Sequence, residues 1–166
     1  MHRKLLVATA LAVTAGLSIA QAPQPPGRPA QAAPAAPAPA GVPLVTMPRT
    51  ASPAGAKVYI VSPADGATVK SPFTIVFGLS GMGIAPAGVQ FENAGHHHLL
   101  IDTDLPANMG MPLPTTDNIR HFGKGQTEAS ITLAPGRHTL QLVLGDHMHV
   151  PFLPILASPK ITITVQ

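Results

Sequence analysis

Apolar and polar residues alternate along several short stretches of this chain. Six stretches show the alternation or a short β-rich run: KVYIV (57–61), SPFTIVFGLSG (71–81), HHHLLID (96–102), QTEASITL (126–133), RHTLQLVLG (137–145) and KITITVQ (160–166). Successive side chains of a strand point to opposite faces, so this period predicts half-buried β-strands. Turn sequences such as SPADG and APG separate the stretches, and no helical stripe follows residue 56. The pattern predicts an all-β fold, an immunoglobulin-like antiparallel β-sandwich over residues 57–166, with a small barrel as the alternative.

The N-terminal third has a different composition. Arg3 and Lys4 precede an uncharged apolar run over residues 5–19, and small residues follow it. This layout is typical of a cleavable signal peptide, here residues 1–22, and the run is short for a membrane span. Residues 23–56 are rich in proline and alanine, which predicts a disordered linker. We therefore expect a periplasmic or secreted protein with no membrane span after signal cleavage.

Charge and cysteine content narrow the range of partners. The formal net charge is +3, and removing Arg3 and Lys4 with the signal leaves eight basic against seven acidic side chains. No basic face with stacking aromatic residues is visible, so a nucleic-acid partner is not expected. The chain has no cysteine. Disulfides and thiolate metal sites are therefore excluded, and the domain must be held by its own core.

The histidines are unevenly placed. Three are consecutive in GHHH (95–98), and two more lie in DHMH (146–149). Leu99 and Ile101 make the better core pair of their strand, which turns His97 inward and leaves the histidines on either side of it facing outward. If strands 96–102 and 137–145 are antiparallel neighbours, the two motifs meet at one edge of a sheet. His121, on the long loop before residue 124, reaches the same end, whereas His138 begins its strand at the opposite end.

Clustered imidazoles favour a transition-metal ion. We predict a metal site from six histidines: His96, His97, His98, His121, His147 and His149. Imidazole binds copper and zinc well, so one of these two ions is expected as the cofactor. Asp146 and Glu92 are candidate acceptors for the second ring nitrogens. Copper gains weight from thioether donors in nearby loops, at Met82, Met109, Met111 and Met148.

Two other functions remain open. The chain lacks the GxSxG nucleophile motif and the HExxH metal motif, and no carboxylate is placed to act as a base, so a non-catalytic protein is favoured. The alternative is a structural or protein-interaction domain of the cell envelope, in which an envelope protein is the partner and the histidines brace the loops. Sandwich folds serve many roles, so the fold alone does not decide.

Four strings resemble one family of small exported bacterial proteins, the domain-of-unknown-function 4399 family. They are VYIVSPADGATV (58–69), GHHHLLIDT (95–103), HFGKGQTE (121–128) and PGRHTLQLVLGDHMHVP (135–151). The resemblance covers about residues 58–165 and implies a periplasmic β-sandwich without an assigned activity. The six predicted ligands match the family motifs, and His138 matches them too. The Met109 and Met111 pair falls in a variable loop, so the family lends no support to copper.

Overall fold

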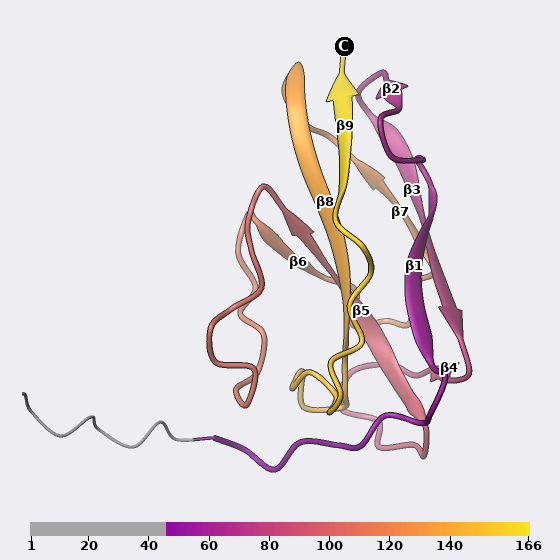
Figure 1. The fold of residues 1–166 in the computed structure, drawn as a ribbon, viewed down its shortest axis with the longest axis vertical. Coiled ribbons are helices and arrows are strands. Elements are labelled where there is room, and N and C mark those ends of the chain that lie inside the picture. The colour runs from indigo at the N-terminus through magenta and orange to yellow at the C-terminus, as the bar shows by residue number, and fades with distance from the viewer. Residues whose placement is uncertain (1–45) are drawn as a thin grey trace, which may run out of the picture. The chain divides into compact units, whose positions relative to one another are not determined.

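The computed structural model describes residues 46–166, so the expected signal peptide and most of the expected linker lie outside the described residues. In this part of the chain the regular elements are all strands, which confirms the predicted all-β architecture (Figure 1). The strands are β1 (Lys57–Ser62), β2 (Thr68–Val69), β3 (Phe73–Ser80), β4 (Gly83–Ile84), β5 (Ala94–Ile101), β6 (Ile119–His121), β7 (Glu128–Ile131), β8 (Gly136–Gly145) and β9 (Ile161–Val165). Within the same residues, no helix has the length and apolar character needed to cross a membrane.

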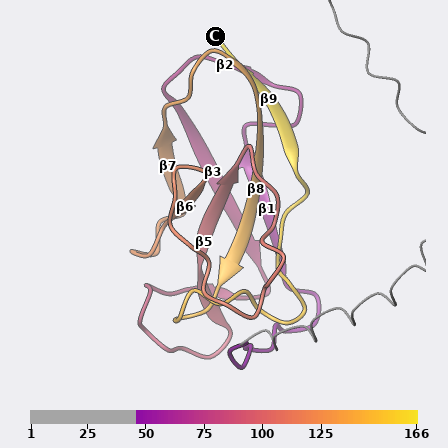
Figure 2. The same ribbon diagram turned by 90° about the vertical axis from the view of Figure 1, so that its left-hand side faces the viewer.

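The strands form two sheets. One has the order β1-β3-β7, and the other has the order β2-β9-β8-β5-β4, with β6 paired to β5. The long pairs are antiparallel, including the predicted pairing of β5 with β8, and the short pairs β2–β9 and β4–β5 are parallel. Figure 2 shows β5 and β8 side by side, with β3 and β7 in the layer behind them.

The main core fills the space between the two sheets. Its fully buried members include Ile75 of β3, Leu99 of β5 and Leu142 of β8, which are side chains of the apolar face that alternation predicts. Ile101 joins the same cluster, so the predicted register of β5 is confirmed. Burying each such side chain contributes about 1.5–3 kcal/mol, and this core holds the sheets together without disulfides.

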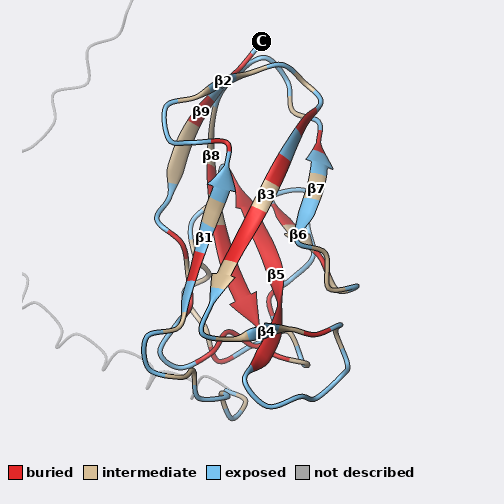
Figure 3. Ribbon diagram, turned by 90° about the vertical axis from the view of Figure 1, so that its right-hand side faces the viewer, coloured by how far each residue is buried: buried red, intermediate tan, exposed pale blue. Residues whose placement is uncertain are grey.

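The outer face of β5 is also covered. All eight residues of β5 are buried, and Figure 3 shows the strand red along its length. The residues between β5 and β6, together with β6 itself, lie on the side of β5 and β8 opposite to β1 and β3 (Figure 1). They bring Leu113 and Ile119 against Leu100 and Val143 in a second, smaller apolar cluster. The outward-facing histidines of β5 are therefore enclosed instead of facing solvent.

Residues 46–53, which we call the N-terminal strap, contact the domain although they belong to the expected linker. Met47 donates its backbone N–H to the carbonyl of Gly110. The N–H of Ser52 donates to the carbonyl of Leu153, and the N–H of Leu153 donates to the carbonyl of Thr50. Strand β1 then begins at Lys57. The strap thus runs past the loop that follows β8 before the sandwich begins.

Candidate metal centre

Four histidines converge at one end of the β5–β8 sheet. His96 and His98 come from β5, His121 from β6, and His149 from the loop after β8. One ring nitrogen of each lies within 4.8 Å of the corresponding nitrogen of the other three. The closest ring centroids, those of His121 and His149, are 4.6 Å apart, and the most distant, those of His98 and His149, are 5.9 Å apart.

Strand pairing explains why residues so distant in sequence meet. His98 is the register partner of His121, so their side chains leave the same face of neighbouring strands. His96 pairs with Gly145, the last residue of β8. The chain then turns over residues 146–149, where the N–H of His149 bonds to the carbonyl of Asp146. This turn directs His149 back over β5.

Two glycines leave room for the rings. A Cβ added at Gly123 would lie 2.2 Å from Cε1 of His121, and one added at Gly145 would lie 2.8 Å from Cε1 of His98. Both distances are shorter than non-bonded contacts allow, so any other residue at these positions would displace an imidazole. The glycines therefore help to set the ring positions.

The ring nitrogens are poorly supplied with hydrogen-bond partners. Nε2 of His96 lies 3.1 Å from Nδ1 of His149, a distance that suits a hydrogen bond in one tautomer. The buried Nδ1 of His96, Nε2 of His121 and both nitrogens of His98 have no partner. An unsatisfied buried polar group costs about 1–3 kcal/mol. An ion bound among the four rings would take one nitrogen from each, and so would supply a partner that the ring of His98 lacks.

Burial favours the neutral form of three rings of the cluster, those of His96, His98 and His121. Desolvation first, and then the charges of His121 and His149, lower the pKa of His96 to about 4. Desolvation, followed by the charges of the neighbouring histidines, lowers the pKa of His98 to about 2. The pKa of His121 is also lowered, by desolvation and then by His149. Neutral imidazoles keep a nitrogen lone pair, which is the form that binds a metal ion.

Asp146 supports the turn that carries His149. Its side chain is buried, and its Oδ1 accepts hydrogen bonds from the backbone N–H groups of Met148 and Val150. Its Oδ2 accepts a hydrogen bond from the Thr50 hydroxyl. Its negative charge opposes the lowering of the His96 pKa, so it acts electrostatically on the cluster. Asp146 thus orders the backbone of the turn and places negative charge near the rings.

The structure does not bring His97 into the group. As the register predicts, its side chain faces the main core, where its ring centroid lies 5.1 Å from that of Phe77. The side chain is 1 % exposed and neither ring nitrogen has a partner. Desolvation lowers its pKa to about 4. His97 and the cluster therefore occupy opposite faces of β5.

His147 also lies apart from the four. The sequence places it on the side of His149 only if this segment is extended, but residues 147–149 form a turn, and His149 has a φ of 67°. His147 instead lines a surface cavity of about 370 Å³ together with Glu92. Glu92 lines the same cavity, and the buried ring nitrogens that it was expected to bind have no hydrogen-bond partner.

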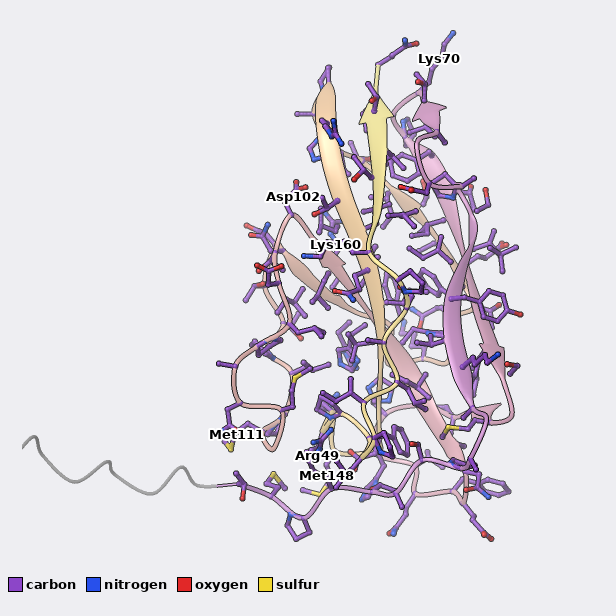
Figure 4. All side chains as sticks on the ribbon, in the orientation of Figure 1. Arg49, Lys70, Asp102, Met111, Met148 and Lys160 are labelled. Carbon is purple, nitrogen blue, oxygen red and sulfur yellow. The ribbon has the colours of Figure 1, made fainter. Side chains whose placement is uncertain are left out.

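Three of the predicted thioether donors lie in different surroundings. Met82 packs against the main core, while Met111 and Met148 are 39 % and 45 % exposed. Figure 4 shows Met111 and Met148 toward the same end of the molecule as Arg49. His138 lies away from this end, as expected, and its ring nitrogens contact Asp102 and the carbonyl of Ala134.

Comparison with known proteins gives a family and no activity. A family model described as "Domain of unknown function (DUF4399)" matches residues 75–166, which include all four converging histidines. No curated protein and no solved structure matches the chain significantly. The family therefore assigns no activity to the cluster.

Proposed function

Because the chain belongs to the DUF4399 family, whose description assigns no activity, we propose its function from the geometry of the site. We propose an exported module that binds a transition-metal ion, copper or zinc, without catalysing a reaction. The ligands are His96, His98, His121 and His149. The convergence of these four imidazoles, two of them fully buried, is the observation that supports the proposal.

The dimensions of the cluster suit a four-coordinate ion. Imidazole nitrogens bind zinc at about 2.0–2.1 Å, which makes the edge of a tetrahedron about 3.3 Å. The contact between Nε2 of His96 and Nδ1 of His149, at 3.1 Å, already has nearly this length. The widest pair of ligand atoms, at up to 4.8 Å, would have to close by about 1.5 Å. Because the His121 and His149 rings are only partly buried, their rotation is the expected source of this movement.

The donor set favours copper or zinc over harder ions. Imidazole suits zinc, copper, nickel and iron, whereas magnesium and calcium prefer oxygen ligands. Since the four donors are alike, the identity of the ion would depend on geometry and on metal supply.

A set of four protein ligands also argues against catalysis. Structural zinc sites are closed by four protein ligands, while catalytic sites leave a position for water or substrate. Asp146, the nearest candidate for a base, uses both carboxylate oxygens to accept hydrogen bonds from Thr50 and the turn. The arrangement is that of a closed binding site, in which no coordination position is left for water or substrate.

The direct test is isothermal titration of the untagged chain with Zn(II) and Cu(II). We expect one ion per chain, bound much more tightly than a dissociation constant of about a millimolar, which corresponds to only about 4 kcal/mol. His149→Asn should weaken binding at least tenfold, because asparagine tolerates the positive φ but offers no imidazole. His138→Asn is the matched control, since His138 contacts Asp102 away from the cluster, and it should bind as wild type. Millimolar binding by wild type, or equal loss in both variants, would refute the metal site.

The hydrogen bond between His96 and His149 supports a second candidate, a structural or interaction domain of the cell envelope braced by its histidines. In that case the bond would join β5 to the turn and keep the loops in shape for a protein partner. Bracing predicts that His149→Asn destabilises the metal-free protein while the wild type gains no stability from added metal. Metal binding predicts instead that added metal raises the melting temperature of the wild type, because a ligand that binds only the folded state stabilises it.

A further inference from the structure

The N-terminal strap is joined to the turn that carries His149. We infer that the strap positions His149 through the contact between Thr50 and Asp146, and so sets the metal affinity of the site. The inference rests on the proposed function and names a positioning residue, Thr50, that touches no metal ligand. Residues that precede the sandwich would thereby help to control the metal affinity of the site.

The first link is a chain of side-chain hydrogen bonds. The Thr50 hydroxyl donates to Oδ2 of Asp146 at 2.7 Å. Oδ1 of the same carboxylate accepts the N–H groups of Met148 and Val150 at 2.9 and 3.0 Å. These two N–H groups belong to the residues immediately before and after His149. Rotation of the Asp146 carboxylate would therefore break a hydrogen bond on each side of the ligand, and only backbone hydrogen bonds, such as that from Leu113 to His149, would still hold the turn.

The second link holds the strap in place. Nε of Arg49 donates to the carbonyl of Pro151 at 2.9 Å, and Nη2 of the same guanidinium donates to the carbonyl of Phe152. The backbones of Ser52 and Leu153 pair on the other side of Thr50. Thr50 is thus fixed from both sides against the residues that follow the turn, and its hydroxyl has a defined direction.

His149 needs this support more than the other ligands do. His96, His98 and His121 lie in strands whose backbones are held by sheet hydrogen bonds. His149 lies in a turn with a φ of 67°, a conformation that a non-glycine residue adopts only when its surroundings hold it there. The exact placement of the fourth ligand therefore depends on Asp146 and on the strap.

Metal binding and strap binding must then affect each other equally. If a docked strap raises metal affinity, a bound ion holds the strap by the same factor. Removing the hydrogen bond from Thr50 to the charged Asp146 is expected to raise the dissociation constant of the metal about tenfold.

Three substitutions test the inference in the full chain. Thr50→Val removes the hydroxyl with little change of shape, and Thr50→Ser restores it. Ser52→Ala is the matched control, because the Ser52 hydroxyl donates to the carbonyl of Pro154 and not to Asp146. Zn(II) titration should show about tenfold weaker binding for Thr50→Val and near-wild-type binding for the other two variants. Co(II) as a probe should lose intensity in its visible absorption bands only in Thr50→Val, since loss of His149 leaves a less tetrahedral site.

Amide hydrogen exchange of the metal-free chains separates this inference from the proposed function. Thr50→Val should speed exchange at Met148 and Val150, the two N–H groups bonded to Asp146, and Ser52→Ala should not. Wild-type affinity and unchanged exchange in Thr50→Val would overturn the inference and leave the metal site standing. Failure of the wild type to bind metal would overturn the proposed function, and the affinity part of the inference with it. The exchange rates would still decide whether the strap orders the turn.

Discussion

His97→Leu should make the metal-free protein more resistant to acid. His97 faces the main core, 1 % exposed, with both ring nitrogens unpartnered and a pKa lowered to about 4 by desolvation. Its ordinary value is 6.5, so between these two values the unfolded chain binds a proton that the folded chain excludes. Stability therefore falls as the pH falls through this window and is unaffected above it. Leucine is similar in size and has no proton to bind.

The size of the effect follows from the two pKa values. For a folded pKa of about 4 and an unfolded pKa of 6.5, linkage gives a loss of about 2 kcal/mol between pH 8 and pH 5. The wild type should lose this amount in addition to what the other buried histidines contribute. The variant should lose about 2 kcal/mol less over the same range. At pH 8 it should also be at least as stable as wild type, because leucine leaves no buried donor unsatisfied.

The assay is urea unfolding of metal-free protein at pH 8, 7, 6 and 5, with the free energy of unfolding extrapolated to water. His97→Met is a second variant, since its flexible side chain adapts if leucine packs poorly against Phe77. Equal losses of stability in wild type and in both variants would show that His97 is not kept neutral in the core. Metal affinity at pH 8 should be unchanged in both, because His97 and the cluster lie on opposite faces of β5.

Three further outcomes follow from the structure. Gly123→Ala should weaken Zn(II) binding by tenfold or more in a titration and change the urea midpoint little. The reason is that the added Cβ would displace the imidazole ring of His121 and no backbone atom. An unchanged affinity would count against His121 as a ligand. His138→Asn should lower the free energy of unfolding more at pH 6 than at pH 9. The hydrogen bond to Asp102 raises the pKa of His138, so the stability that this pair contributes is lost as the pH rises through the raised pKa. A larger loss at pH 9 than at pH 6 would contradict the pairing. Leu142→Ala should destabilise the fold by about 2–5 kcal/mol in the same assay, because Leu142 is fully buried between the sheets, and a loss below 1 kcal/mol would mean that the core is not as described.

Alternation in the sequence was enough to predict the fold and half of the site. The period of β5 placed Leu99 and Ile101 in the core, which put His97 inward and made His96 and His98 neighbours. The antiparallel pairing of β5 with β8 then brought residues near position 147 beside them. These inferences held because a strand with one apolar face admits a single register.

The remaining features depend on tertiary contacts that no local pattern reports. The three residues of β6 are too few to show a period, so the sequence placed His121 in a loop, whereas pairing with β5 fixes it opposite His98. The histidines of DHMH were expected to point the same way, but the turn reverses the chain and separates His147 from His149. The contact of Thr50 with Asp146 joins a proline-rich segment to the domain across 96 positions, a distance beyond the reach of sequence periodicity.

The two faces of β5 leave this strand little mutational freedom. Successive residues serve the hydrophobic interior and the imidazole cluster in turn, so inserting or deleting one residue would exchange the two sets at once. A substitution leaves the register intact, so one histidine of the cluster can be replaced at a time, whereas a change of length within β5 cannot be confined to one face. Differences in chain length between related proteins are therefore expected in the loops that flank β5 and not within the strand.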